Sequence, residues 1–426
     1  METTVVEGLR TVKFDLILTL ALAALFLFAG YFVQRRVPLF SRANIPAAAI
    51  GGLLCALLVL ALRSQGALGV SLNTSLRGPL QTAFFTTIGL NATLGLLRAG
   101  GWRMGFFWLL ATLTALAQNA VGIAAALALG APPLLGVICG ALTLTGGPAT
   151  GLAWAERFEA AGVPGAGALI IASAMFGIFT ASLVGNPVAT ALIRRFKLAG
   201  DAGAARGGRE DEFWALSPTV DLVDESEAAG REWAAPEGEL TGGVLLHNLL
   251  LILLVMGVGA LVSLLARHPS FTLPDYIGAM VCAAVVRNVD DRTGWFRVNV
   301  RAVEALSGVA LALFLVLALM SLELWKVAGL ALPMLVILAA QVVVMILYAV
   351  AVTFVLMGRD YEAAVTAGGH VGFGLGITAN AVANMEALTA RYGPAPRSFL
   401  YVPIVGAFFI DFSNSLVISL FVNLAR

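Results

Sequence analysis

The sequence predicts an all-α polytopic membrane protein, with about ten transmembrane helices in two inverted five-helix repeats that each contain a re-entrant hairpin. Three observations support this fold class. The chain of 426 residues is 59% hydrophobic and only 12% charged, whereas soluble domains usually carry about 25% charged residues. Apolar runs long enough to cross a bilayer recur along its whole length. A glycine-rich segment interrupts these runs once in each half.

Ten apolar segments have the length that a membrane-crossing helix needs, which is roughly 20 residues. Five precede a charged central segment and five follow it. They lie at residues 14–33, 45–62, 80–97, 104–129, 164–193, 243–265, 274–290, 303–321, 328–356 and 398–424. The first run is too long for a signal peptide, and no obvious small-residue cleavage site follows it.

Two further segments, at about 133–158 and 359–391, each have two moderately apolar arms around a glycine-rich middle. An arm of about 12 helical residues covers about 18 Å, which is short of the roughly 30 Å hydrocarbon core. We therefore expect each segment to enter the membrane, turn and leave on the same side. Irregular backbone at that depth is tolerated only where it lines protein or a wet cavity. The alternative is that each segment is one broken span.

The two halves of the chain resemble each other at three landmarks, which occur in the same order. "NIPAAAIGGLLC" at Asn44 resembles "TLPDYIGAMVC" at Thr272, "LTGGPATG" at Leu144 resembles "AGGHVGFG" at Ala367, and "GIFTASLVGNP" at Gly177 resembles "GAFFIDFSNS" at Gly406. Five spans per half is an odd number, so the second repeat must be inverted, an architecture typical of secondary transporters. The predicted divisions are a first repeat at 1–196, a linker at 197–241 and a second repeat at 242–426.

Lysine and arginine positions predict the orientation. With both termini outside, 18 of the 26 basic residues face the cytoplasm, in agreement with the positive-inside rule. The charged linker is then cytoplasmic. The first hairpin enters from outside and the second from inside, so their tips would meet near the middle of the membrane.

Composition and motifs argue against several other classes. The net charge of +1 argues against nucleic-acid binding. Cys55, Cys139 and Cys282 are too scattered for a disulfide framework or a metal cluster. The Gly-x-Gly-x-Gly pattern at 372–376 follows no strand, so it does not indicate a dinucleotide loop. No catalytic triad or metal-ligand spacing is present, so we expect no enzyme and no organic cofactor.

The hairpin tips are the predicted substrate site. Glycines let the backbone unwind, so that N–H and C=O groups can face a ligand, and nearby hydroxyl and amide groups add polar contacts. The candidates are Thr143, Thr145, Gly146, Gly147, Thr150, Gly368, Gly369, His370, Thr378, Asn380 and Asn384. Alternatively, the glycines serve close helix packing. His370 could act as a substrate donor or proton relay, or it could pin the hairpin through a hydrogen bond.

Four oxygen-bearing residues are candidate Na⁺ ligands. Asp411 is the only acidic residue of the last span, where a carboxylate costs about 2.5–3.5 kcal/mol. Asn414 lies three residues on, on the same helix face. Asn186 holds the related place in the first half, and Asn91 lies within the third span. Asp411 could instead be a buried structural acceptor, and Asn91 could form an interhelical hydrogen bond.

The longest motif is "GGHVGFGLGITANAVANMEALTARYGPAPRSFLYVPIVGAFFIDFSNSLVI", which begins at Gly368. It closely resembles the C-terminal signature of the bacterial sodium/glutamate symporter family. "LTGGPATGLAWAERFEAAG" and "AMFGIFTASLVGNPVATALI" resemble the matching signature of the first half. The family's glycine-rich tips map onto Gly146–Gly151 and Gly368–Gly376. Its first tip usually reads Gly-Gly-His-Gly-Thr, whereas this chain has Pro148 and Ala149 in the third and fourth places.

The resemblance implies a homodimeric, elevator-type, Na⁺-coupled carrier of L-glutamate in the bacterial inner membrane, in contact with membrane lipid. Spans near 14–62 and 243–290 would form a static dimer scaffold. Proline removes an N–H donor from the first tip, so another small carboxylate or amino acid is an alternative substrate. Two further alternatives are proton coupling through His370 and a membrane sensor that no longer transports.

Overall fold

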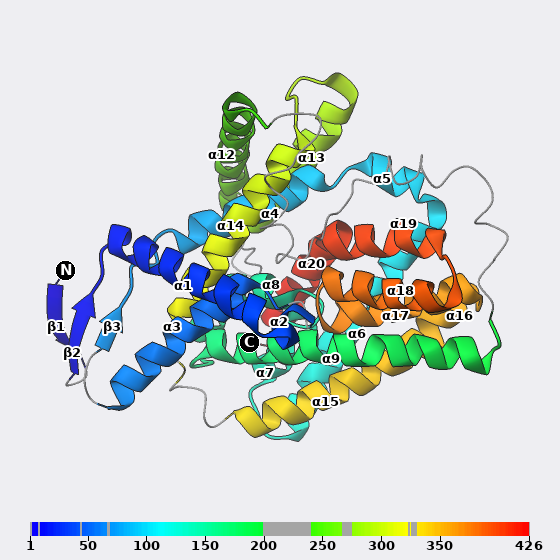
Figure 1. Cartoon of the computed structure of the whole chain (residues 1–426), viewed down its shortest axis with the longest axis horizontal. Helices are drawn as coiled ribbons and strands as arrows, with labels where there is room; N and C mark the ends of the chain where they lie inside the picture. Colours follow the sequence, from blue (N-terminus) through cyan, green and yellow to red (C-terminus); the bar gives the residue numbers. More distant parts are fainter. Residues whose placement is uncertain are drawn as a thin grey trace. The chain divides into compact units, whose positions relative to one another are not determined.

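The computed structural model describes residues 2–6, 9–42, 45–65, 69–198, 240–265, 275–322, 324 and 330–425 (Figure 1). The linker predicted at 197–241 lies outside these ranges except for two residues at each end. Asn44 and residues 272–274, which open the first pair of repeated motifs, also lie outside them. The chain divides into two compact units, and each unit takes segments from both halves of the sequence.

Unit 1 comprises Met1–Thr93, Leu152–Leu169 and Glu225–Gly329. Its helices are α1 (Leu16–Arg36), α2 (Pro38–Arg42), α3 (Ala47–Ser64), α4 (Arg77–Asn91), α12 (Gly242–Leu265), α13 (Asp275–Thr293) and α14 (Val300–Met320). A core of Leu90, Leu251, Ile252, Val255, Ala283 and Val303 joins α4, α12, α13 and α14. The first three spans of the second half therefore pack with the third span of the first half, α4.

A small sheet was not expected from the sequence. It contains β1 (Glu2–Val6), β2 (Leu9–Lys13) and β3 (Gly69–Ser71), with β1 antiparallel to β2 and β2 parallel to β3. The β-branched threonines and valines of the first two strands favour extended backbone. The sheet lies outside the apolar segments, so the chain remains essentially helical.

Unit 2 comprises Leu94–Gly151, Ile170–Asp224 and Leu330–Arg426. Its helices are α5 (Leu94–Ala99), α6 (Gly101–Ala128), α7 (Pro133–Val137), η1 (Ile138–Leu142), α8 (Gly147–Ala160), α9 (Ala166–Arg195), α15 (Ala331–Tyr348), η4 (Ala349–Thr353), α16 (Phe354–Leu356), α17 (Tyr361–Leu375), α18 (Thr378–Tyr392), α19 (Pro396–Ile404), η5 (Val405–Phe409) and α20 (Ile410–Leu424). Residues 152–169 of α8 and α9 belong to unit 1. The π-helical turns η1, η4 and η5 interrupt regular α-helix.

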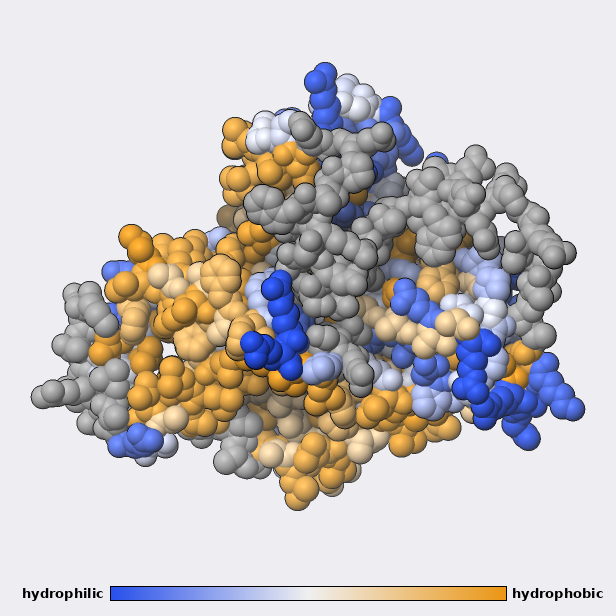
Figure 2. Space-filling model, in the orientation of Figure 1, coloured by the Kyte–Doolittle hydropathy of each residue, from blue (hydrophilic) through white to orange (hydrophobic). Residues whose placement is uncertain are grey.

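Eight helices among the described residues are long and apolar enough to cross a membrane. They are Leu16–Arg36, Ala47–Ser64, Gly101–Ala128, Ala166–Arg195, Gly242–Leu265, Val300–Met320, Ala331–Leu356 and Pro396–Leu424. Phe28 and Leu25 of α1 are exposed, and Figure 2 shows mostly hydrophobic residues over the face of this helix that is in view, as a lipid-facing surface requires. The chain is therefore a multi-pass membrane protein.

The other two predicted spans are also helical but do not meet the same criterion. The 15 residues of α4 cover about 22 Å, because the helix ends at Asn91 rather than continuing to residue 97. The 19 residues of α13 carry a charged C-terminal end, "RNVDDRT". Eight of the ten predicted spans thus coincide with helices that have the length and composition to cross a membrane.

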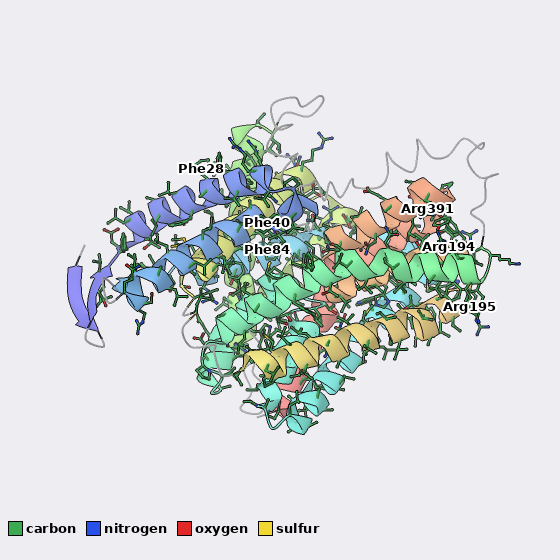
Figure 3. All side chains as sticks on the ribbon, turned by 60° about the horizontal axis from the view of Figure 1, so that its bottom comes forward. Phe28, Phe40, Phe84, Arg194, Arg195 and Arg391 are labelled. Atoms are coloured by element: carbon green, nitrogen blue, oxygen red, sulfur yellow. The ribbon has the colours of Figure 1, made fainter. Side chains whose placement is uncertain are left out.

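Polar residues fix where several helices begin and end. The side chain of Asp15 accepts a hydrogen bond of 2.8 Å from the backbone N–H of Leu18 at the start of α1. Asp360 caps α17 in the same way, with a bond of 2.7 Å to the N–H of Ala363. Arg194 lies in the last turn of α9 and Arg391 in the last turn of α18, at the same end of unit 2 (Figure 3). These cations also favour the negative ends of the helix dipoles.

Candidate functional site: two helical hairpins and their turns

Each predicted hairpin segment folds as two helical arms joined by a turn. In the first, α7 and η1 lead to a turn at residues 143–146, and α8 follows. In the second, α17 and α18 flank a turn at Gly376 and Ile377. A Cβ atom placed on Gly147 would lie 3.2 Å from Cγ2 of Ile377. The two turns therefore lie against each other within unit 2.

The first turn is held by its own threonines. The hydroxyl of Thr143 lies 2.6 Å from the carbonyl of Ile138 and 2.6 Å from the hydroxyl of Ser173. Thr145 donates to Oε1 of Gln118 at 2.7 Å. The helix before the turn is broken at Gly140, whose ψ of −142° is not helical. The hydroxyl of Thr143 is thus already used in hydrogen bonds that hold the turn.

Gly147 and Pro148 begin the second arm of this hairpin. Gly147 has a φ of +67°, a conformation that side chains rarely adopt, so glycine is required here. Pro148 follows in the first turn of α8. Backbone N–H groups there have no intrahelical partner, so proline does not disturb the helix. It does remove one donor from the start of α8. Thr150 is buried close by.

The second turn is tighter than the sequence suggested. Gly376 leaves the helix with a φ of −133° and a ψ of −118°. The side chain of Asn380 then accepts a 3.1 Å hydrogen bond from the N–H of Ile377. Thr378 stands half-buried in the first turn of α18. Within the second hairpin, only Gly376 and Ile377, between α17 and α18, lie outside helical structure.

Four glycines of the second hairpin lie inside a continuous helix, so the prediction that this run unwinds is wrong for them. They are Gly368, Gly369, Gly372 and Gly374, all buried in α17. Their missing side chains let other elements come close. A Cβ on Gly372 would lie 2.6 Å from the backbone nitrogen of Ala381. The glycine pairs of the two repeated motifs therefore lie at different points of their hairpins. Gly146 and Gly147 lie at a turn, whereas Gly368 and Gly369 lie within a helix.

Two asparagines of α18 attach the second hairpin to α9. Nδ2 of Asn380 donates to the hydroxyl of Ser182 at 2.6 Å and to the carbonyl of Ile178 at 3.2 Å. Nδ2 of Asn384 donates to the carbonyl of Ala181 at 3.2 Å. These bonds fix the start of α18 against a helix of the first half of the chain.

His370 lies in the middle of α17 rather than at its tip. The ring is fully buried, and Nδ1 lies 2.8 Å from the hydroxyl of Thr353. Nε2 lies 3.3 Å from the hydroxyl of Thr114. Phe107 and Phe373 pack against the ring with centroids 5.2 and 5.1 Å away. A substrate contact by His370 would have to replace one of these hydrogen bonds.

The cation candidates Asp411 and Asn414 lie near the start of α20. Asp411 is half-buried, and its carboxylate has no hydrogen-bond or ion-pair partner among the residues that the structure describes. Asn414 is fully buried and donates from Nδ2 to the carbonyl of Ala141 in η1 at 3.0 Å. Its Oδ1 is buried without a hydrogen-bond partner. This oxygen is free to take a cation.

The other two cation candidates are placed differently. Asn186 is half-buried on α9, directly before Pro187. Asn91 is the last residue of α4 and belongs to unit 1, whereas the other three candidates belong to unit 2. Its Oδ1 is also buried without a hydrogen-bond partner. The structure therefore groups three of the four candidates in one unit.

Sequence reasoning missed the buried amides of α6 and α15. Asn119 accepts a 2.9 Å bond from the backbone N–H of Ala141, so two asparagine side chains hold the N–H and the carbonyl of this one residue of η1. Gln118 bonds both hairpins, and Gln341 donates to the backbone carbonyl of Gln118 at 2.6 Å. The pair "QN" within the apolar run "TALAQNAVGIAA" was the signal that could have found the two amides of α6.

The lysines and arginines that the structure describes in unit 2 are exposed or half-buried, whereas Arg77 of unit 1 donates to the carbonyl of Leu152 in the second arm of the first hairpin. Among the described residues of unit 2, no lysine or arginine is buried, and those near the hairpins, Arg359, Arg391 and Arg397, lie exposed at helix ends. The groups that could hold an anion near the turns are hydroxyls, amides and backbone N–H groups. The first turns of α8 and α18 supply such N–H groups, with the positive ends of two helix dipoles.

Comparison with known proteins identifies the family of the chain. The family described as "Sodium/glutamate symporter" matches residues 12–394. Proteins of that name from Escherichia coli K12 and Shigella flexneri are each 41% identical over 411 residues, covering 96% of this chain and 98% of theirs. The one from Haemophilus influenzae is 37% identical over 398 residues, covering 93% and 94%. The chain belongs to the sodium/glutamate symporter family.

Proposed function

We propose that this protein carries L-glutamate together with Na⁺ across the bacterial inner membrane. The observation that supports this best is the meeting of two helix starts. The helices α8 and α18 begin at turns that lie against each other, in a unit whose described residues include no buried basic side chain. Two dipole ends could bind the two carboxylates of one glutamate without a buried arginine.

The predicted site residues divide into two roles in this proposal. Thr150 and Thr378, with the N–H groups of the first helical turns, would contact the substrate. Thr143, Thr145, His370, Asn380 and Asn384 would hold the turns in position, because their side chains already bond other parts of unit 2. Gly146, Gly147, Gly368 and Gly369 would allow the close approach of backbone.

Na⁺ would bind near the start of α20. Asp411 offers a carboxylate with no described partner, and Oδ1 of Asn414 is an unpaired buried oxygen. Carboxylate and amide oxygens are the ligands that hard cations prefer. Asn186 would add an oxygen from α9. Asn91 would serve a second cation or an interhelical bond within unit 1.

The division into units supports an elevator mechanism. Unit 1 holds the first three spans of each half, including those proposed as the static scaffold and dimer contact. Unit 2 holds both turns and would be the mobile transport core. In this scheme the repeats at 1–196 and 242–426 are inverted, both hairpins are re-entrant, and α4 and α13 also cross the membrane. Both termini would lie outside and the linker inside.

Counterflow in proteoliposomes separates a carrier from a membrane sensor that kept the fold. Vesicles loaded with unlabelled glutamate are diluted into labelled glutamate with Na⁺ on both sides. A carrier accumulates label transiently, whereas a sensor gives the trace of empty vesicles. Aspartate and other dicarboxylates in the outer solution then test the substrate alternative that Pro148 raises.

Replacing His370 tests proton coupling. We expect His370→Gln to lower the melting temperature, because the buried ring fills space between Phe107 and Phe373. We expect no change in the response of uptake to a pH gradient, since the geometry favours a structural role. Uptake by the unaltered protein and by His370→Gln is measured with and without an inward proton gradient. Loss of a proton-driven component in His370→Gln would instead support the relay.

A further inference from the structure

One buried side chain contacts both hairpins. Gln118 lies fully buried in α6. Its Oε1 accepts a 2.7 Å hydrogen bond from the hydroxyl of Thr145, and its Nε2 donates to the carbonyl of Gly374 at 2.6 Å. A primary amide in an apolar span is costly unless its donor and acceptor groups are both bonded. Here the two bonds go to different hairpins.

The two hydrogen-bond partners of Gln118 lie in or next to the hairpin turns, so they move when the turns move. Thr145 lies in the first turn, between η1 and α8. Gly374 lies in the last turn of α17, which ends at Leu375. The final carbonyls of a helix have no intrahelical partner, so Gln118 satisfies one of them. Moving either turn away from α6 would leave a buried polar group unpaired.

The backbone of Gln118 is itself fixed. Its carbonyl accepts the 2.6 Å bond from Gln341 of α15. Gly122, one turn further along α6, lies so close to Gly136 of α7 that a side chain would strike its backbone. The amide of Gln118 therefore extends from a rigid part of unit 2. With the backbone held, only the side-chain amide can turn, so losing its bond to one hairpin frees it to turn and weakens its bond to the other.

We propose that Gln118 is a positioning residue that couples the two hairpin turns, so that a change at one turn is transmitted to the other. This inference deepens the proposed function and rests on it for its link to transport. If Na⁺ binding orders one turn and glutamate contacts both, the coupling makes Na⁺ raise the affinity for glutamate. Such a coupling acts in both directions.

Hydrogen–deuterium exchange tests the coupling without any transport. Three variants are compared with the unaltered full chain in lipid nanodiscs: Gln118→Met, Thr145→Val and, as the matched control, Gln341→Met. The control removes a buried amide that bonds neither turn. Its bond goes to the backbone carbonyl of Gln118, and α6 stays held there by the packing of Gly122 against Gly136, so the side chain of Gln118 keeps its place in this variant. Peptides covering residues 143–150 and 374–380 report on the two turns.

We expect Gln118→Met to speed exchange in both turns by about tenfold, as the loss of a buried hydrogen bond predicts. Thr145→Val should speed exchange in the second turn as well, although Thr145 lies in the first. It also serves as the milder variant if Gln118→Met does not fold. The proposal is wrong if Thr145→Val affects only the first turn, or if Gln341→Met acts like Gln118→Met.

Uptake kinetics give the functional readout. The KM for glutamate is measured at low and at saturating Na⁺, and the ratio of the two values is compared. Gln118→Met should reduce this ratio by about fivefold or more, in the range of typical coupling energies. A merely structural defect would lower the maximal rate and leave the ratio unchanged. If the unaltered protein shows no Na⁺-dependent uptake, the proposed function fails, while the exchange result still decides the coupling.

Discussion

Replacing Gly372 with alanine should reduce Na⁺-driven uptake to background while the protein remains folded. The added Cβ would lie 2.6 Å from the backbone nitrogen of Ala381 and 2.9 Å from the carbonyl carbon of Asn380. Contacts this short do not occur in folded proteins, and backbone atoms of α18 cannot move aside as a flexible side chain could. The start of α18 must therefore shift away from α17.

The functional loss follows from what this shift displaces. Asn380 both caps the second turn and bonds Ser182 of α9, so moving it disturbs the site and its attachment together. Overpacking of this kind costs about 1–3 kcal/mol, which a protein of this size can survive. Uptake and melting temperature are measured together to separate the two effects.

Gly105→Ala is the matched control for this substitution. Gly105 also lies in a helix of unit 2, but a Cβ there meets nothing within 4 Å. Alanine favours a helix by about 1 kcal/mol over glycine, so this variant should keep full activity and gain slightly in stability. Full activity in Gly372→Ala would show that the close approach of α17 and α18 is not needed for transport.

Replacing Asp411 with asparagine should raise the Na⁺ concentration needed for half-maximal uptake by about tenfold or more, with expression unchanged. The carboxylate stands in a span with no described partner. An isolated charge there costs about 2.5–3.5 kcal/mol on insertion scales, so its presence calls for a compensating cation. Asparagine keeps the shape and one oxygen but removes the charge that attracts Na⁺.

The Na⁺ dependence of glutamate uptake is measured for Asp411→Asn beside Glu386→Gln. Glu386 is an exposed acidic residue of α18 in the same unit. Glu386→Gln changes the net charge by the same amount as Asp411→Asn, and it should leave the Na⁺ dependence of uptake unchanged. Asn414→Leu should act in the same direction as Asp411→Asn, because it removes the unpaired Oδ1. An unchanged Na⁺ dependence in Asp411→Asn would remove Asp411 from the cation site.

The positions of the elements could be predicted because they depend on hydropathy and length. All ten apolar segments coincide with helices, and both hairpin segments fold as two arms around a turn. The predicted helix ends that were wrong lie where the helix is interrupted within an apolar run. The helix α4 ends at Asn91, whereas apolar residues continue to residue 97. Hydropathy does not detect where a helix stops within an apolar run.

The roles of individual site residues could not be predicted, because they depend on which elements come close in space. A glycine run is compatible with unwound backbone or with tight packing, and only the contact of Gly372 with α18 decides between them. Gln118 was overlooked because an amide within a span has no fixed periodicity. Its importance comes from two partners that are distant in sequence, Thr145 and Gly374.

The most direct test of the account is uptake of labelled L-glutamate into proteoliposomes that contain the purified protein. An inward Na⁺ gradient is compared with an equal K⁺ gradient, and empty liposomes give the background. We expect accumulation with Na⁺ and none with K⁺, which would establish the substrate and the coupling ion together. Equal uptake with the two gradients, or none with either, would contradict Na⁺-coupled glutamate transport by this protein.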